Sequence, residues 1–191
     1  MPPRRCTGWP PWLNCGGSWV SSRRAGAQRP GEQLVHVTFV CSGNICRSPM
    51  AEKMLAHQIA GRGLAEQVRV TSAGTGGWHA GDGADHRTNA VLLAHGYPTT
   101  HRAAQLDDDH LAADMVVAMG RNHARMLADM GVPPERLRMM RSFDPRSGAF
   151  TLDVEDPYYG GPEDFEAVFT VIEAALPGLH DWIDEQLGRH R

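Results

Sequence analysis

Cysteine is scarce in this chain of 191 residues, and none lies beyond position 46. Cys6 and Cys15 lie near the N-terminus, while Cys41 and Cys46 lie five positions apart in one short stretch. A disulfide framework of the kind that holds small secreted domains together is therefore implausible. A reaction that passes a disulfide along a relay of cysteines is also disfavoured, because such a relay needs cysteines well downstream of the first pair.

Long apolar runs are also missing, so the sequence predicts no transmembrane helix. The N-terminus carries arginines, but Pro10, Pro11, Gly16 and Gly17 interrupt the apolar segment that a signal peptide would need. We therefore expect a cytoplasmic protein without a membrane partner. Export by a route that needs no signal peptide is compatible with the same sequence.

Negative charge dominates the body of the chain, although the formal net charge is only −3. Residues 1–33 carry five arginines against one glutamate, so residues 34–191 are more acidic than the total suggests. An acidic body argues against a nucleic-acid partner, whose phosphates attract Lys and Arg. The first 33 residues are rich in Pro, Gly, Ser and Arg without periodicity, which predicts a disordered extension. Residues 34–191 then form one domain, a size that suits a single core.

Strand and helix patterns alternate in that domain. Apolar, β-rich runs occupy residues 35–40, 68–71, 114–119 and 137–140, and a helical pattern follows each of them. Asp85 is placed to cap one helix, the run Asp107-Asp108-Asp109 could cap a short helical turn that reaches Ala113, and Pro177-Gly178 predicts a kink or restart in the last helix. Such alternation predicts right-handed βαβ units and an α/β fold, with helices on both faces of a parallel sheet. In sheets of this kind, ligands bind beyond the carboxyl ends of the strands.

The stretch VCSGNICRSP, residues 40–49, joins the first strand to the first helix. Unpaired backbone N–H groups and the positive end of the helix dipole make an anion site there, and the same field favours the thiolate form of Cys41. Arg47 adds a planar fork of donors for two phosphate oxygens. Gly43 and Asn44 suit the backbone conformations that aim amides inward. Nucleophile, anion cradle and arginine together predict a cysteine-dependent phosphatase.

The motif Cys41-x5-Arg47-Ser48-Pro49 after the first strand resembles the low-molecular-weight protein tyrosine phosphatases, and the actinobacterial members in particular. Three further motifs follow in the order of that family: SAGTGGWH at 72–79, RSFDP at 141–145 and DPYYG at 156–160. The resemblance runs from about residue 34 to about residue 188. It implies a single α/β domain with a four-stranded parallel sheet in the order 2-1-3-4, helices on both faces, and a phosphate-binding loop after the first strand.

The resemblance also implies a role for each motif. Cys41 is expected to be the nucleophile that forms a phosphocysteine, and Asp156 the general acid and base. Arg47 and the backbone amides of the loop are expected to stabilise the transferred phosphoryl group. The expected phosphate-binding residues are Ser42, Gly43, Asn44, Ile45, Cys46, Arg47 and Ser48. The resemblance implies no metal and no cofactor.

Two further groups of residues complete the expected site. Ser72 and His101 match a serine and a histidine that hold the loop asparagine in the family. The substrate cleft is expected to be walled by Trp78, His79, Tyr158 and Tyr159, whose rings can stack on an aromatic substrate.

Three assignments stay open on the sequence. The Ser48 hydroxyl either bonds the sulfur of Cys41 or caps the helix. Asp156 has three competitors for the role of acid, namely Asp153, Glu155 and Asp164. Cys46 is either a small buried residue or a thiol that captures the oxidised form of Cys41 as a disulfide.

Three other functions compete with a tyrosine phosphatase. Phosphoarginine phosphatases of the same fold tend to carry Thr where this chain has Ile45, and they lack the tyrosine pair. Arsenate reductases need the downstream cysteines that are absent here. A non-catalytic phosphotyrosine-binding module would be expected to have lost the nucleophile or the acid, and both are present. We therefore expect phosphotyrosine-containing proteins as partners, phosphate or similar oxyanions in the loop, and a monomer.

Overall fold

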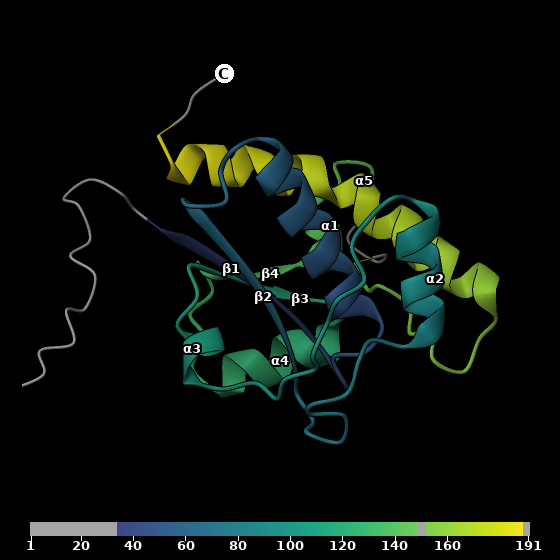
Figure 1. Ribbon diagram of the computed structural model, residues 1–191. Coiled ribbons are helices and arrows are strands. Elements are labelled where there is room, and N and C mark those ends of the chain that lie inside the picture. The colour runs from purple at the N-terminus through teal and green to yellow at the C-terminus, as the bar shows by residue number, and fades with distance from the viewer. Residues whose placement is uncertain (1–33, 149–151, 189–191) are drawn as a thin grey trace, which may run out of the picture. The chain divides into compact units, whose positions relative to one another are not determined.

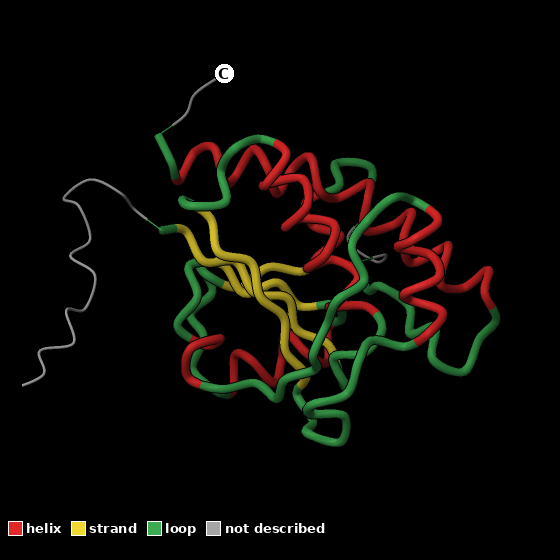
Figure 2. The backbone as a smooth tube through the Cα atoms, in the orientation of Figure 1, coloured by secondary structure: helices red, strands yellow, loops and turns green. Residues whose placement is uncertain are grey.

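A computed structural model describes residues 34–148 and 152–188 of the chain. The predicted extension, residues 1–33, lies outside these ranges. The described part contains four parallel strands, β1 (Val35–Cys41), β2 (Val68–Gly74), β3 (Met115–Ala118) and β4 (Leu137–Met139). Their order in the sheet is β2-β1-β3-β4, which confirms the predicted topology (Figures 1 and 2).

Strand β1 lies in the interior of the sheet and is buried on both faces, with Val35, Val37 and Phe39 on one face and His36 and Thr38 beside Val40 on the other. All seven of its residues are buried, and it pairs with β2 on one side and β3 on the other. The register sets Cys41 beside Gly74 of β2, and Val40 beside Ala118 of β3. The carboxyl ends of three strands therefore meet at the residue where β1 stops.

Helices cover both faces of the sheet, as the alternating pattern predicts. Figure 1 shows α1 (Arg47–Gly61), α2 (His86–Ala94) and α5 (Pro162–Gln186) on one side, and α3 (Asp108–Leu111) and α4 (Arg121–Asp129) on the other. Asp85 accepts a hydrogen bond from the N–H of Arg87 at the start of α2, and Asp107 caps α3 in the same way. The predicted cap at Asp85 is thus confirmed, and of the three acids at 107–109 the structure selects Asp107 as the cap. None of the helices in the described residues combines the length and the apolar character that crossing a membrane requires.

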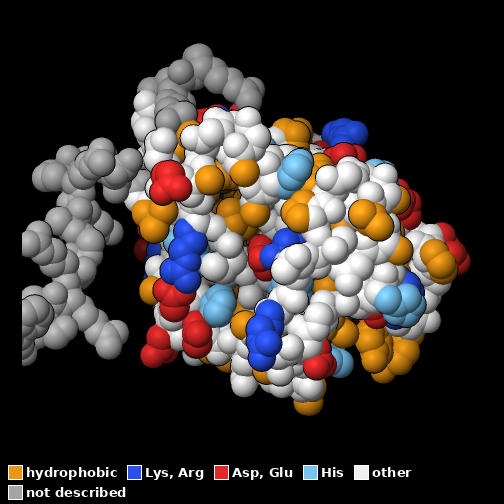
Figure 3. Space-filling model, viewed as in Figure 1, with side chains coloured by type: hydrophobic (Ala, Val, Ile, Leu, Met, Phe, Trp, Pro, Cys, Tyr) orange, Lys and Arg blue, Asp and Glu red, His pale blue; other side chains and the backbone are white. Residues whose placement is uncertain are grey.

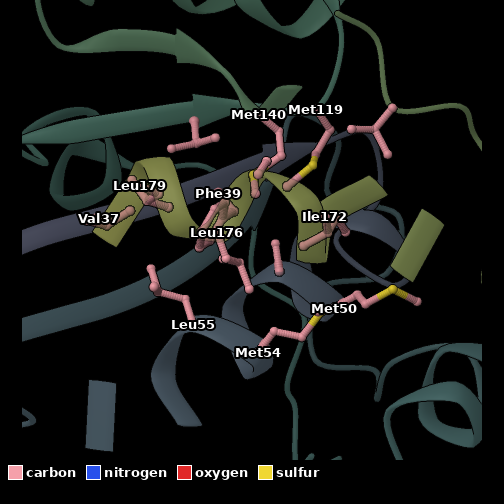
Figure 4. Close-up of a cluster of buried hydrophobic side chains, with 14 of the residues drawn as sticks. Val37, Phe39, Met50, Met54, Leu55, Met119, Met140, Ile172, Leu176 and Leu179 are labelled. Atoms are coloured by element: carbon pink, nitrogen blue, oxygen red, sulfur yellow. The ribbon is translucent and has the colours of Figure 1, made fainter. Parts of the chain in front are cut away.

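The larger core cluster lies between the sheet and the pair α1 and α5. Ten of its side chains are labelled in Figure 4: Val37, Phe39, Met50, Met54, Leu55, Met119, Met140, Ile172, Leu176 and Leu179. The opposite face of β1 contributes Val40 to a smaller cluster with Leu127 of α4. Full burial of each large apolar side chain contributes roughly 1.5–3 kcal/mol. The two clusters therefore fix the position of β1 from both faces.

The structure excludes one of the two outcomes predicted for the last helix, a restart at Pro177. Helix α5 continues from Pro162 to Gln186 through Pro177, with no restart at that position. Buried residues on both sides of the proline, Leu176 and Leu179 among them, pack on the core and offset the hydrogen bond that the proline removes. Gly178 serves close packing, because a Cβ at this position would lie 2.2 Å from the carbonyl oxygen of Phe143. That carbonyl belongs to the 3-10 turn η1 (Met140–Phe143), which takes over from β4 one residue earlier than the sequence pattern predicts.

The surface of the described domain mixes both signs of charge. On the face shown in Figure 3, acidic and basic side chains are interspersed, and the basic ones do not merge into a continuous patch. This distribution on that face is unlike the single basic stripe that marks many nucleic-acid-binding surfaces.

Candidate functional site

The loop between β1 and α1 occupies the carboxyl end of the sheet. We call residues 42–48 the phosphate loop. The end of β2 supports it, because the N–H groups of Thr75 and Gly76 donate to the carbonyl oxygens of Cys41 and Ser42, each at 2.9 Å. A Cβ on Gly74 would lie 2.8 Å from the carbonyl oxygen of Ser42. Glycine at position 74 is therefore required for the loop to approach β2 this closely.

Asn44 shapes the phosphate loop. It is fully buried and has a φ of 57°, the left-handed conformation expected of it. Its amide nitrogen donates to Ser48 Oγ at 2.9 Å and to Ser72 Oγ at 2.8 Å, and its amide oxygen accepts from the N–H of Ala104 at 2.8 Å. The left-handed conformation costs roughly 1–2 kcal/mol. Each buried hydrogen bond contributes about 1 kcal/mol, so three of them are sufficient to offset that cost.

His101 and Ser72 both contact Asn44. The Nε2 atom of His101 lies 2.9 Å from the carbonyl oxygen of Asn44. Burial lowers the pKa of His101, which favours the neutral form of the ring. Ser72 donates its own proton to Glu52, a half-buried residue of α1. Glu52 escaped the sequence analysis, although its position one helical turn after Ser48 puts the two on the same face of α1.

The sulfur of Cys41 lies at the base of the loop with only 2% of the residue exposed. It accepts the N–H of Asn44 at 3.3 Å and lies 3.0 Å from Ser48 Oγ. Helix α1 has no side-chain cap. The geometry thus favours the sulfur over the helix end as the partner of the Ser48 hydroxyl. A thiolate here receives two hydrogen bonds, and each of them stabilises the negative charge.

Arg47 connects the phosphate loop to a second segment, residues 153–156, which we call the acid loop. The guanidinium is buried and donates to the carbonyl oxygen of Val154 at 3.2 Å, to Ser42 Oγ at 3.4 Å and to Asp156 at 2.5 Å. The Nε atom of Arg47 is buried without a hydrogen-bond partner. An oxyanion in the loop would therefore find donors on Arg47 that protein atoms do not fully use.

The four competing acids differ in their hydrogen-bond partners and in their exposure. Both oxygens of Asp153 are bonded to Arg121, and Asp164 accepts the N–H of Gly161 at the start of α5. Glu155 is exposed. Asp156 is the one of the four acids that lines the same pocket as Cys41. This placement favours Asp156 over its three competitors.

The pocket above Cys41 has a volume of about 280 Å³. The four predicted cleft residues all line it, namely Trp78, His79, Tyr158 and Tyr159. The side chains of Trp78 and Tyr159 are largely solvent-exposed, at 78% and 97% of the residue, although both are large and aromatic. The rings of the two tyrosines meet edge to face at 5.0 Å. Exposed rings around a buried sulfur form a slot that fits a flat aromatic group.

Arg87 supports the tyrosine segment, and the sequence analysis overlooked it. Its guanidinium donates to the carbonyl oxygens of Tyr158 at 3.0 Å and Gly160 at 2.9 Å. It also pairs with Asp85 and lies 4.4 Å from the centre of the Phe165 ring. The Asp85 backbone N–H donates to the carbonyl oxygen of Ile45 in the phosphate loop at 2.8 Å. The ion pair of Asp85 and Arg87 thereby connects the two tyrosines with the phosphate loop.

His123 is a second residue that the sequence analysis missed. Its Nε2 atom shares a hydrogen bond of 2.9 Å with Ser42 Oγ, and its Nδ1 atom is buried without a partner. Burial, followed by the charge of Arg47, lowers the pKa of His123 to about 4. The ring is therefore neutral at ordinary pH. In the sequence His123 lies on an amphipathic helix far from the loop, so only the fold reveals the contact.

Comparison with known proteins identifies a family. The model of the family "Low molecular weight phosphotyrosine protein phosphatase" matches residues 36–190. The "Low molecular weight protein-tyrosine phosphatase A" of Mycobacterium tuberculosis is 68% identical over 156 residues, which cover 82% of this chain and 96% of that protein. This match agrees with the resemblance to actinobacterial members.

Solved structures agree with the fold. The crystal structure of a protein tyrosine phosphatase from Entamoeba histolytica superposes with a TM-score of 0.72 at 31% identity, covering 82% of this chain and 99% of the other. An arginine phosphatase from Drosophila superposes with a TM-score of 0.69 at 29% identity, covering 76% of this chain and 96% of the other. Two substrate classes are therefore represented among similar structures.

Proposed function

The chain belongs to the low molecular weight phosphotyrosine protein phosphatase family and is a protein-tyrosine phosphatase, and we propose that it acts through a phosphocysteine on Cys41. The observation that carries the proposal is the position of the Cys41 sulfur, which lies at the base of a pocket also lined by Arg47 and Asp156. These are the nucleophile, the anion clamp and the acid that hydrolysis of a phosphate monoester requires.

In the first step, the thiolate of Cys41 attacks phosphorus while the bond from phosphorus to the tyrosyl oxygen breaks. The amides of the phosphate loop and Arg47 hold the equatorial oxygens, since phosphoryl transfer depends mainly on positioning and charge stabilisation. The phosphate competes with Asp156 for Arg47, to which Asp156 is bonded in this structure. Once released from Arg47, Asp156 takes up a proton from solvent, and in this carboxylic acid form it donates the proton to the oxygen of the departing tyrosinate.

In the second step, the Asp156 carboxylate takes a proton from water as the water attacks the phosphocysteine. The phosphorus–sulfur bond breaks and its electron pair returns to Cys41. The Ser48 hydroxyl, 3.0 Å from the sulfur, stabilises the thiolate that leaves. Inorganic phosphate then departs from the loop.

The aromatic slot supports phosphotyrosine over phosphoarginine as the substrate. Trp78 and Tyr159 offer exposed ring faces, and Ile45 adds an apolar contact to the pocket lining. We expect kcat/KM to be at least about fivefold higher for a phosphotyrosine peptide than for the same peptide with phosphoarginine, because ring stacking of about 1 kcal/mol or more favours the aromatic group. Phosphate release from the two peptides measures the ratio.

A matched variant tests the cause of that preference. Trp78→Ala should lower the ratio by reducing turnover of the phosphotyrosine peptide alone, whereas Trp78→Phe should retain it. Equal rates on both peptides for the unaltered protein would exclude the preference for phosphotyrosine, and faster hydrolysis of the phosphoarginine peptide would favour a phosphoarginine phosphatase. Absence of turnover on either peptide, with binding retained, would instead indicate a phosphotyrosine-binding module.

The proposal also covers the domain bounds, the partners, the oligomeric state and the location of the enzyme. Residues 34–191 form the catalytic domain, with residues 1–33 as an extension. The partners are phosphotyrosine-containing proteins, and the enzyme acts as a monomer. The reaction needs a reduced thiol at Cys41, which supports a cytoplasmic location. No cysteine follows Cys46, which argues against an arsenate reductase.

Cys46 is proposed to protect the nucleophile from oxidation. Peroxide converts the Cys41 thiolate to a sulfenic acid, and the Cys46 thiol then displaces water to form a disulfide. Cys46 is buried. Burial is the main cause that raises the pKa of its thiol to about 12, and the negative charge of Asp85 raises it further. It is therefore a protonated thiol, so peroxide is expected to attack Cys41 first.

Recovery after oxidation tests the role of Cys46. After a peroxide pulse followed by thiol reductant, the unaltered protein is expected to regain most of its activity and Cys46→Ala to regain little. Each recovery is normalised to the activity of the same protein before peroxide, which removes any direct effect of the substitution. Equal recovery would show that Cys46 is a packing residue only.

A further inference from the structure

The first turn of α4 lies between the two loops of the site. Helix α4 begins at Arg121 directly after β3, and its N-cap is Gly120, which has no side chain to bond the first amides. The acid loop and the phosphate loop each make a hydrogen bond to this turn. These two contacts come from segments that are remote from each other in the chain.

The acid loop supplies the missing cap. Asp153 Oδ1 accepts the backbone N–H of Arg121 at 2.6 Å, and its Oδ2 pairs with the Arg121 guanidinium at 2.6 Å. The next residue, Val154, donates its N–H to the carbonyl oxygen of Met119 at 2.9 Å. Asp153 thus accepts one of the free N–H groups of the first turn, that of the first helical residue, whereas an Asp or Ser at residue 120 would bond the second or third.

Glycine at position 120 makes room for this arrangement. A Cβ there would lie 3.1 Å from Asp153 Oδ1 and 3.4 Å from His123 Nδ1. The first distance is tighter than ordinary van der Waals contact, so a side chain would displace the Asp153 carboxylate. Gly120 has an extended backbone with a φ of −164°, which any residue can adopt. Space beside Asp153, and not backbone strain, is therefore what glycine provides.

The phosphate loop meets the same turn through His123. The hydrogen bond between His123 Nε2 and Ser42 Oγ involves the residue directly after the nucleophile, and Ser42 Oγ also accepts a bond from Arg47. Because burial lowers the pKa of His123 to about 4, the ring adds no positive charge beside Arg47 at ordinary pH. A neutral imidazole can therefore hold the Ser42 hydroxyl without opposing the anion clamp.

We propose that the first turn of α4 sets the acid loop against the phosphate loop, with Asp153 and His123 as positioning residues for the reaction. The proposal rests on the proposed function, because it takes Asp156 as the acid. The Asp156 side chain is about half exposed, at 48%, so its own packing does not fix it. The contacts of Asp153 and Val154, which lie three and two residues earlier, hold its backbone within reach of the pocket.

Asp153 is tested by two variants with different remaining contacts. Asp153→Asn removes the charge but keeps an oxygen that can accept the Arg121 N–H, whereas Asp153→Ala removes both. Asp153→Ala is expected to lower kcat on a phosphotyrosine peptide by roughly tenfold or more, since a misplacement of about 1 Å can cost on the order of 10²-fold. On p-nitrophenyl phosphate, whose leaving group needs less protonation, the loss should be under about threefold. Asp153→Asn should stay within about threefold on both substrates.

The contact between His123 and Ser42 is also tested by two variants, one that can keep the hydrogen bond and one that cannot. His123→Gln can reach Ser42 with its terminal amide, whereas His123→Asn is too short. His123→Asn is expected to lower kcat/KM on both substrates by a similar factor, on the order of tenfold, because the phosphate loop serves every phosphate ester. His123→Gln should retain most of the activity.

Two controls separate positioning from lost stability. Asp107→Ala removes the cap of α3, which lies apart from the site, and should lower Tm without changing the ratio between the two substrates. Gly120→Ala leaves Asp153 intact but crowds its carboxylate, and should reproduce the substrate ratio of Asp153→Ala in weaker form. If Asp153→Ala proves unfolded, Gly120→Ala still tests the acid-loop contact.

The outcomes separate this inference from the function on which it rests. An equal loss on both substrates for Asp153→Ala, or equal behaviour of its Ala and Asn variants, would overturn the positioning role of Asp153. His123→Gln as poor as His123→Asn would overturn the role of His123. If Asp156→Asn itself shows no dependence on the leaving group, the assignment of the acid has failed. A selective Asp156→Asn with a non-selective Asp153→Ala overturns the inference alone.

Discussion

Cys41→Ser is expected to abolish turnover while the protein remains folded and still binds phosphate esters. A serine hydroxyl is protonated at neutral pH and is a poor nucleophile beside a thiolate. Its oxygen can still receive hydrogen bonds from the N–H of Asn44 and the hydroxyl of Ser48, which now meet the sulfur. Removal of a nucleophile costs on the order of 10⁶-fold in kcat in a serine protease, and a loss of that order would bring activity to background.

Three measurements define this result. Steady-state hydrolysis of p-nitrophenyl phosphate gives the activity, thermal unfolding gives the fold, and calorimetric titration with a phosphotyrosine peptide gives the binding. Arg47→Ala is the matched contrast, because it should lose binding as well as turnover. The unaltered enzyme should remain active in EDTA. Substantial activity in Cys41→Ser, or an enzyme that EDTA inactivates, would exclude the phosphocysteine mechanism.

Asp156→Asn is expected to slow hydrolysis of phosphotyrosine far more than hydrolysis of esters with good leaving groups. Tyrosinate is a strong base and leaves poorly unless it is protonated, and asparagine cannot supply the proton. General acid catalysis typically contributes on the order of 10²–10⁴-fold. The loss on a phosphotyrosine peptide should fall in that range, and the loss on p-nitrophenyl phosphate should be markedly smaller. A series of aryl phosphates with phenols of graded acidity measures the difference.

Glu155→Gln is the matched control for this experiment. Glu155 is an exposed acid that immediately precedes Asp156 in the acid loop. It should leave the dependence of rate on leaving group unchanged. Should Asp156→Asn instead slow every ester equally, Asp156 would be a structural residue, and Glu155 and Asp153 would be the next acids to test.

Several features of the site could be predicted from the sequence because each depends on residues that lie close together in the chain. The spacing of Cys41 and Arg47 between a strand and a helix predicts a loop whose amides and arginine face one anion. Asn44 indicates a left-handed residue in that loop, and its φ of 57° agrees. Asp85 and Asp107 cap the helices that follow them. In each case the partners are a few residues apart, so backbone geometry alone brings them together.

Family resemblance extended the prediction to partners that are remote in the chain. Ser72 and His101 contact Asn44 as the motifs imply. The residue pattern by itself would not have paired them, because the contact depends on the register between β1 and β2 and on the path of the chain after β2. Helix α5 marks the opposite case. Its Pro177-Gly178 pair predicts a kink or a restart by local rules, and core packing on both sides of the proline keeps the helix from restarting.

The sequence by itself determined the order of strands and helices and the loop that joins the first strand to the first helix, and it proposed Cys41 in that loop as the nucleophile, because these follow from periodicity and from spacings within one turn or loop. Only the tertiary structure decided which acid shares the pocket with Cys41, and it alone paired Asp153 with Arg121 and His123 with Ser42. Each of these contacts joins segments that are far apart in the chain. Their geometry is set by how β1, β3 and α4 pack, and no local pattern of residues records it.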